Sequence, residues 1–154
     1  GVKRIIEEIK EEGLDQYIVT TSSNVAVESL INKFFDSNES PFLGIISGDN
    51  VKHKKPSPEA YLKAINQCNH KSKEIIVFED SLAGYTAATK ANLNTVITVP
   101  SWNKIPINKF KNSFLIVDSF GDKNKNSTIY KSPTQSIDYI NFQYIKESLE
   151  IYIL

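Results

Sequence analysis

The chain of 154 residues is 40% hydrophobic and 23% charged, a composition typical of a globular domain long enough to bury a core. Eighteen basic residues balance eighteen acidic ones, so we expect neither nucleic acid nor an anionic membrane as a partner. No apolar run approaches the ~18 residues of a membrane span. The single cysteine, Cys68, excludes an internal disulfide and fits a reducing compartment, either the cytoplasm or the plastid stroma.

The start of the chain is unusual for a complete protein. Its first residue is Gly1, the sequence contains no methionine, and an amphipathic pattern begins at once. We therefore expect the chain to be a fragment of a longer protein.

Helical and extended patterns alternate along most of the chain. Apolar residues recur at helical spacing from Val2 to Leu14, and Gly13 is suited to end that helix. In chain order we expect helices at 2–13, from the residue after a Ser22 or Ser23 cap to Phe34, and at 58–68 and 82–91, and strands at 17–19, 42–47, 75–78, 95–99 and 114–117. This alternation predicts an α/β fold with a mostly parallel sheet of right-handed βαβ units.

The last part of the sequence differs in composition. Residues 123–136 are rich in Lys, Asn and Ser and predict a polar flexible linker, whereas the aromatic and apolar residues 137–154 predict a C-terminal helical extension. We therefore expect a core domain at 1–122, followed by the linker and the extension.

Residues 75–84 are the centre of the functional interpretation. Four apolar residues, typical of a strand buried on both faces of a parallel sheet, run into Glu79 and Asp80, and a small-residue helix pattern follows. Ligands bind at the carboxyl ends of such strands, and neighbouring carboxylates repel each other unless a cation or a proton compensates. The pair therefore predicts a metal site, although Asp80 or Ser81 could simply cap the next helix.

Two earlier segments also carry polar residues near strand ends. Residues 20–23 place hydroxyls and N–H groups at the entry to a helix, where phosphate is favoured, although Ser22 or Ser23 could serve only as the helix cap. Lys55 precedes Pro56, which favours an extended backbone that can aim the ammonium at a phosphate; the alternative is a solvated lysine in a basic loop. Together, the hydroxyls, the lysine and the acid pair predict phosphoryl chemistry with Mg²⁺.

These residues resemble the motifs of the haloacid-dehalogenase (HAD) superfamily of phosphohydrolases. Thr21 matches the second motif, Lys-Pro-Ser-Pro at 55–58 the third, and Glu-Asp-Ser-Leu-Ala-Gly at 79–84 the fourth. The last two together resemble the branch that contains β-phosphoglucomutase and the CbbY-like sugar-bisphosphate phosphatases. The resemblance covers roughly residues 1–122 and implies a Rossmann-like three-layer αβα core.

The resemblance also implies a role for each of these residues. In the family, an aspartate nucleophile takes the phosphoryl group and water hydrolyses the aspartyl phosphate, with Mg²⁺ as cofactor. Thr21 and the backbone at Ser22 would bind the phosphoryl oxygens, and Lys55 would neutralise the nucleophile and the phosphate. Asp80 would hold Mg²⁺, and Glu79 would assist directly or through water.

One expected part is absent from the sequence. The first motif of the family, Asp-x-Asp, supplies the nucleophile and the general acid/base, and no Asp-x-Asp occurs in these 154 residues. The resemblance places this motif upstream, ahead of a helical cap domain, on a central strand between the strands that end near Thr21 and Glu79. We therefore expect a sheet without its middle strand, and a chain that alone binds Mg²⁺ and phosphate weakly and is inactive.

Three functions remain open. The resemblance favours a monomeric, Mg²⁺-dependent phosphatase for a small phosphorylated sugar, with xylulose 1,5-bisphosphate as the leading substrate, although the cap that selects the substrate is not among these residues. A β-phosphoglucomutase-like mutase is the second alternative. The third is a non-catalytic binding or regulatory protein, because a chain without the nucleophile cannot carry out the chemistry of the family.

Overall fold

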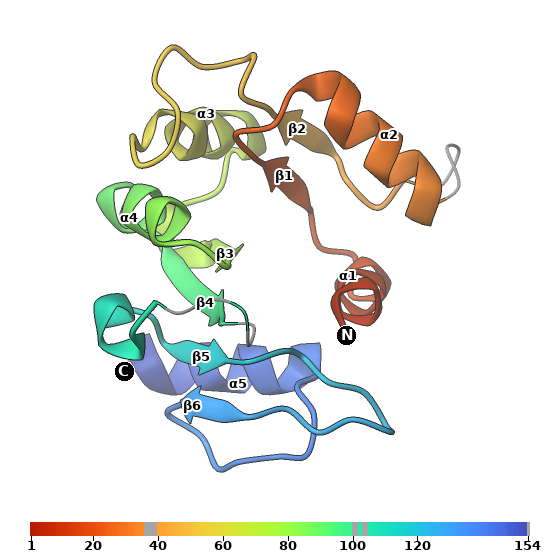
Figure 1. Cartoon of the computed structure of the whole chain (residues 1–154), viewed down its shortest axis with the longest axis vertical. Coiled ribbons are helices and arrows are strands. Elements are labelled where there is room, and N and C mark those ends of the chain that lie inside the picture. Colours follow the sequence, from red (N-terminus) through yellow and green to blue (C-terminus); the bar gives the residue numbers. More distant parts are fainter. Residues whose placement is uncertain (36–39, 100–101, 103–104, 154) are drawn as a thin grey trace.

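The computed structural model describes residues 1–35, 40–99, 102 and 105–153 (Figure 1). Its α-helices are α1 (Val2–Glu11), α2 (Asn24–Phe34), α3 (Glu59–Cys68), α4 (Leu82–Lys90) and α5 (Phe142–Ile153). Its strands are β1 (Tyr17–Val19), β2 (Gly44–Ile46), β3 (Ile76–Glu79), β4 (Asn94–Thr98), β5 (Leu115–Val117) and β6 (Ile129–Lys131), and two short 3₁₀ helices are η1 (Ser72–Glu74) and η2 (Ile107–Phe110). The predicted α/β fold with mostly parallel strands is confirmed. None of the helices in these ranges is long and apolar enough to cross a membrane.

The elements follow the predicted alternation, with shifts at their boundaries. α2 begins at Asn24, and Ser23, one of its two candidate caps, accepts a hydrogen bond from the Ala26 N–H at 3.4 Å. α3 begins at Glu59, later than predicted, and Pro58 is its N-cap residue. Loop residues therefore occupy more of the segment between β2 and α3 than the sequence pattern indicates.

The strands form two separate sheets in the described part of the chain. β1 pairs in parallel with β2, with Tyr17 opposite Gly44. The larger sheet has the order β3-β4-β5-β6, and all its pairs are parallel except β5 with β6. No ladder joins β1 to β3 in this part of the chain. This break lies where the resemblance implies that a middle strand is missing.

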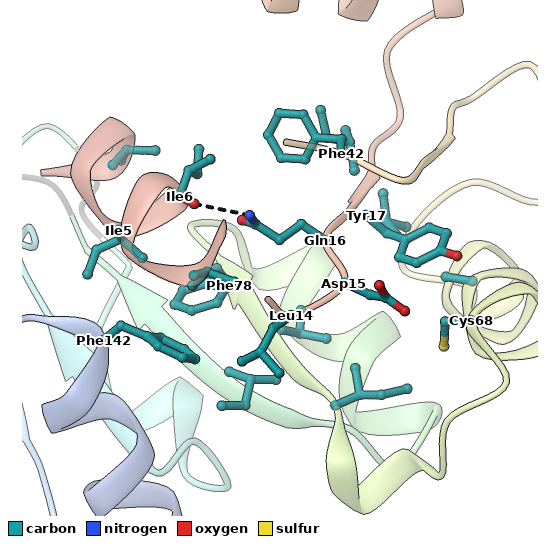
Figure 2. Close-up of a pocket in the computed structure, with 18 of the residues that line it drawn as sticks. Ile5, Ile6, Leu14, Asp15, Gln16, Tyr17, Phe42, Cys68, Phe78 and Phe142 are labelled. Atoms are coloured by element: carbon teal, nitrogen blue, oxygen red, sulfur yellow. Dashed lines mark hydrogen bonds between the residues drawn. The ribbon is translucent and has the colours of Figure 1, made fainter. Parts of the chain in front are cut away.

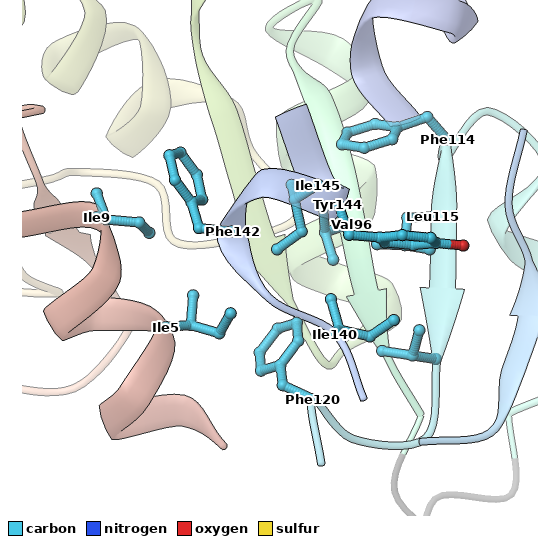
Figure 3. Packing of buried hydrophobic residues seen from close by; sticks show 11 residues of the cluster. Ile5, Ile9, Val96, Phe114, Leu115, Phe120, Ile140, Phe142, Tyr144 and Ile145 are labelled. Atoms are coloured by element: carbon cyan, nitrogen blue, oxygen red, sulfur yellow. The ribbon is translucent and has the colours of Figure 1, made fainter. Parts of the chain in front are cut away.

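Helices cover both faces of the larger sheet, which gives three layers. On one face, Val96 and Leu115 belong to an apolar cluster with side chains of α1 and α5, including Ile5 and Ile145 (Figure 3). On the other face, Ile97 and Ile116 pack against α4 and η2, and Val77 of β3 packs against α3 and α4. Successive residues of each strand thus point to opposite helical layers, which is the arrangement of an αβα core.

The segment 123–136, predicted to be a flexible linker, contains an ordered strand instead. β6 pairs antiparallel with β5, with Val117 opposite Ile129. The Lys131 ammonium donates a hydrogen bond to the Lys111 carbonyl at 2.8 Å and another to the Ser113 carbonyl, and burial lowers the pKa of Lys131. Pairing with β5 orders these three residues, although their polar neighbours give the segment the composition of a linker. The expected helical extension contains α5.

Arg4 ties α1 to the larger sheet. Its guanidinium donates hydrogen bonds to the carbonyls of Phe120 (3.1 Å), Gly121 (3.0 Å) and Ile140 (2.7 Å). It also forms an ion pair with Glu8 at 2.6 Å. α1 is therefore held beside α5 by polar contacts as well as by its apolar face.

Replacing Arg4 with Met should lower the free energy of unfolding by about 2 kcal/mol, because carbonyl groups lose a charged hydrogen-bond donor. Lys3→Met is the matched control, since Lys3 is exposed and its contacts are a 3.7 Å ion pair with Glu7 and a cation–π contact with Phe35 at 5.9 Å; its effect should stay within about 0.5 kcal/mol. Urea unfolding followed by circular dichroism measures both. Equal effects of the two substitutions would contradict the assigned role of Arg4.

Candidate active site

Lys55 connects the carboxyl ends of two strands from different sheets. It lies in the loop between β2 and α3, and its ammonium donates a hydrogen bond to the Val19 carbonyl at the end of β1 at 2.9 Å. The same ammonium forms an ion pair with Glu79, the last residue of β3. The structure therefore brings together two of the predicted site residues, Lys55 and Glu79, and excludes the solvated-lysine alternative.

The Glu79 carboxylate is buried among hydrogen-bond donors. The side chains of Lys55 and Glu79 are only 8% and 6% exposed. Oε1 of Glu79 accepts hydrogen bonds from Lys55 and from the Tyr61 hydroxyl, and Oε2 accepts one from the Ser81 hydroxyl at 3.3 Å. A buried carboxylate of this kind is compensated by the ammonium and by hydrogen bonds, so its charge is balanced without a metal ion.

Tyr61 is a site residue that the sequence interpretation missed. Its hydroxyl accepts a hydrogen bond from the Lys55 ammonium at 3.2 Å while donating to Glu79. Burial and the nearby Glu79 charge raise the pKa of Tyr61, so the phenol is neutral at physiological pH and acts as a donor. The available signal was a tyrosine on the buried face of the helix after Lys55, since a buried phenol requires a polar partner.

Gly84 leaves room for the Glu79 carboxylate at the start of α4. A Cβ atom on Gly84 would lie 1.8 Å from Oε2 of Glu79. The Gly84 N–H donates a hydrogen bond to Ser81 Oγ at 3.0 Å, and Ser81 is the N-cap of α4. Of the two candidate caps, Asp80 and Ser81, it is therefore Ser81 that caps α4.

Asp80 differs from Glu79 in its exposure to solvent. It is exposed, whereas Glu79 is buried, as expected for neighbours at the end of a strand. The described residues contain no group of three or more His, Cys, Asp or Glu side chains that could hold a metal ion. Asp80 alone of the predicted metal-binding pair could face a cation in solvent while Glu79 keeps its buried partners.

Thr21 and Ser22 form an exposed elbow that contacts the β2 loop. The Ser22 carbonyl accepts a hydrogen bond from the Gly48 N–H at 2.7 Å, and the Thr21 carbonyl accepts one from the Lys54 ammonium at 3.3 Å. A Cβ atom on Gly48 would lie 2.3 Å from the Thr21 carbonyl oxygen, so glycine permits this close approach. The elbow lies at the end of β1, where Lys55 also reaches the Val19 carbonyl.

Carboxylates fix the loops around this edge. Glu59 accepts hydrogen bonds from the backbone N–H groups of Lys52 (2.8 Å) and His53 (2.9 Å), and these bonds lower the pKa of Glu59. Asp49 accepts a hydrogen bond from the Asn24 N–H at 2.9 Å, so an acidic side chain already satisfies one donor at the start of α2. Neither role was predicted, because both depend on partners outside the local pattern.

Replacing Lys55 with Met should lower the free energy of unfolding by about 3–5 kcal/mol, because it leaves the Glu79 carboxylate buried without its cation. The double variant Lys55→Met/Glu79→Leu should recover much of this loss. Chemical unfolding of the two single variants and the double variant measures the coupling. Additive effects would show that the two side chains do not interact.

Gly84→Ala should destabilise the chain by about 1–3 kcal/mol, because the new methyl group overlaps the Glu79 carboxylate. In an ordinary helix the same change would stabilise by up to about 1 kcal/mol. The sign of the change in thermal unfolding therefore tests whether Glu79 lies against Gly84.

Comparison with known proteins identifies relatives of this chain. The sequence profile of haloacid dehalogenase-like hydrolases matches residues 1–98. Protein CbbY of Rhodobacter capsulatus is 33% identical over 105 residues, which cover 68% of this chain and 46% of that protein. A phosphorylated carbohydrates phosphatase of Thermotoga maritima is 32% identical over 104 residues, covering 64% of this chain and 45% of that protein.

Solved structures of CbbY also resemble this chain in fold. The structure of CbbY from Rhodobacter sphaeroides in complex with xylulose-(1,5)bisphosphate superposes with a TM-score of 0.69 and 30% identity, covering 77% of this chain and 52% of that one. The chain thus spans about half the length of the relatives it matches. With the buried Lys55–Glu79 pair at the strand ends and a profile match over most of its length, the chain belongs to the haloacid dehalogenase-like hydrolase family.

Proposed function

We propose that these 154 residues form the phosphate- and metal-binding side of a phosphatase for small phosphorylated sugars, and that sequence outside them supplies the nucleophile. The observation that carries the proposal is the position of Lys55, whose ammonium bridges the ends of β1 and β3. A fixed cation at the carboxyl edge of a parallel sheet is suited to a phosphoryl group and to a nearby carboxylate nucleophile.

Different residues would have different roles in binding the phosphoryl group. The Thr21 hydroxyl and the Ser22 backbone N–H lie at the exposed elbow after β1 and would donate hydrogen bonds to phosphoryl oxygens. Lys55 would stabilise negative charge on the phosphoryl group and on the nucleophile. Glu79 and Tyr61 would position Lys55, because both already bind its ammonium.

The exposed carboxylate of Asp80 is the residue that fits Mg²⁺. This ion commonly takes one or two carboxylates and fills its remaining positions with water and substrate phosphate oxygens. When bound, it would supply positive charge that stabilises the transferring phosphoryl group. Glu79 would act in this scheme by holding Lys55 rather than by contacting the metal directly.

The relatives support phosphorylated sugars as the substrate class. One relative is a phosphorylated carbohydrates phosphatase, and the CbbY structure contains xylulose-(1,5)bisphosphate. A phosphorylated pentulose is therefore the first substrate to test. A mutase activity remains the second candidate, since a structure of β-phosphoglucomutase from Clostridium difficile has the same fold, with a TM-score of 0.70.

The chain alone should be inactive, because it contains no Asp-x-Asp. A chimera that joins it to the unmatched half of Rhodobacter capsulatus CbbY should release inorganic phosphate from xylulose 1,5-bisphosphate in the presence of Mg²⁺. Asp80→Asn should reduce this rate by roughly 10²-fold, in the range found for the loss of one electrostatic contact to a transition state.

Asp138→Asn is the matched control, since Asp138 is an exposed carboxylate in a different part of the chain; its rate should be unchanged. Phosphate release from the isolated chain, or full activity of the Asp80→Asn chimera, would contradict the proposal. Conversion of β-glucose 1-phosphate without phosphate release would favour the mutase.

A further inference from the structure

Two neighbouring lysines reach the end of β1 and the elbow that follows it. The Lys55 ammonium donates a hydrogen bond to the Val19 carbonyl at 2.9 Å, and the Lys54 ammonium donates one to the Thr21 carbonyl at 3.3 Å. Thr21 belongs to the elbow that would bind phosphoryl oxygens. The chain therefore places two cations, and not one, beside the candidate phosphate site.

The two lysines differ in how their charges are balanced. The Lys55 side chain is 8% exposed, and its ion pair with Glu79 offsets its charge. Lys54 is exposed. Within the described residues its ammonium has a neutral partner, the Thr21 carbonyl, and forms no ion pair with a carboxylate. Because a neutral acceptor leaves the charge of the ammonium in place, an anion at this elbow is attracted by Lys54 more than by Lys55.

Gly48 brings the loop after β2 into contact with both the elbow and Lys54. Its N–H donates a hydrogen bond to the Ser22 carbonyl at 2.7 Å. A Cβ atom on Gly48 would lie 2.3 Å from the Thr21 carbonyl oxygen and 3.0 Å from Nζ of Lys54. The ammonium therefore lies against both segments, and the lack of a side chain on Gly48 leaves it that space.

The backbone is fixed on both sides of Lys54. Before it, Glu59 accepts hydrogen bonds from the N–H groups of Lys52 (2.8 Å) and His53 (2.9 Å). After it, Lys55 is held by its buried ion pair. A cation on a fixed backbone loses less conformational freedom on binding an anion than a cation on a mobile loop does. The fold therefore presents Lys54 to the elbow in a defined position.

The start of α2 is a less favourable place for a second anion. The Asn24 N–H donates a hydrogen bond to the Asp49 carboxylate at 2.9 Å. A phosphate group above Asn24 would therefore meet a like charge, which costs free energy. An anion beside Lys54 meets an opposite charge instead.

We propose that Lys54 binds the phosphate group that is not transferred, in a sugar that carries two phosphate groups. The inference rests on the proposed function, in which the transferred phosphoryl group lies beside the buried Lys55. Lys54 is on the exposed side of the same elbow, so it meets a part of the substrate that stays nearer to solvent. This contact is the same in the bound substrate and in the transition state, so Lys54 acts on substrate affinity and not on the reacting atoms. The site should therefore prefer bisphosphorylated sugars to monophosphorylated ones.

Titration of the chain with two anions tests the proposal directly. NMR chemical shifts of the backbone N–H groups at residues 20–24 would follow the binding of xylulose 1,5-bisphosphate and, separately, of inorganic phosphate. Lys54→Met should weaken bisphosphate binding about fivefold, the upper end of the range for an exposed ion pair, and keep the affinity for inorganic phosphate within about twofold. Lys54→Arg, which retains the charge, should bind the bisphosphate as the unsubstituted chain does.

Lys52→Met is the matched control, because it removes the same charge from the same loop. Lys52 is exposed, and its backbone N–H, which binds Glu59, is retained in the variant. Its affinity for the bisphosphate should stay within about twofold of the unsubstituted chain. Equal weakening by the Lys52 and Lys54 variants would show a general loss of positive charge and would overturn the proposal. Circular dichroism checks that all variants are folded.

Kinetics of the chimera with the unmatched half of Rhodobacter capsulatus CbbY separate this inference from the proposed function. For xylulose 1,5-bisphosphate, Lys54→Met should raise KM about fivefold and keep kcat within about twofold. For xylulose 1-phosphate and xylulose 5-phosphate, both parameters should be unchanged.

The outcomes distinguish the two proposals. An inactive chimera would contradict the proposed function, and the titration of the chain would still decide the role of Lys54. An active chimera whose KM for the bisphosphate is unchanged by Lys54→Met would overturn the role of Lys54 alone. A loss of kcat in that variant, or an unsubstituted chain that binds the bisphosphate no more tightly than inorganic phosphate, would also overturn it.

Discussion

The buried ion pair between Lys55 and Glu79 is the interaction on which the candidate site depends. It joins the end of β1 in one sheet to the end of β3 in the other, where no backbone ladder connects them in the described residues. Removing two charges from water is costly, and Tyr61 and Ser81 offset part of that cost through hydrogen bonds to the carboxylate. The same pair weakens the positive electrostatic field that an incoming phosphate meets, because the negative charge of Glu79 largely balances the positive charge of Lys55. Strong phosphate binding therefore requires further positive charge at this edge.

The break in the sheet and the anchoring of α1 are two aspects of one arrangement. Arg4 holds α1 against the carbonyls of Phe120, Gly121 and Ile140, while β1 is held at its carboxyl end by Lys55. These polar contacts hold α1 and β1 on either side of an apolar pocket of about 700 Å³, which residues of β3 also line (Figure 2). Such a gap leaves apolar surface in contact with water, which costs free energy in proportion to its area.

The sequence predicted those parts of the site that follow from local pattern. Lys55, Glu79 and Asp80 adjoin local sequence signals, namely a proline-rich helix start and the end of an apolar strand. The structure brings Lys55 and Glu79 together in an ion pair, a contact that was not predicted. The role of Tyr61 could not be read in this way, because it depends on a carboxylate 18 residues away along the chain. The role of Gly84 depends on the direction in which the nearby Glu79 side chain turns. β6 was not predicted for a different reason. Ile129 and Tyr130 favour a strand, but the run is only three residues long between polar neighbours, and its order comes from pairing with β5.

Glu79 and Asp80 show how the strand end separates two acidic roles. Their neighbouring charges suggest a shared cation, yet the alternation of a strand sends one side chain inward and the next outward. Glu79 takes the buried side with Lys55, and Asp80 takes the exposed side. Because the described residues contain no group of three or more His, Cys, Asp or Glu side chains that could hold a metal ion, an ion at Asp80 would need further ligands such as water or phosphate oxygens.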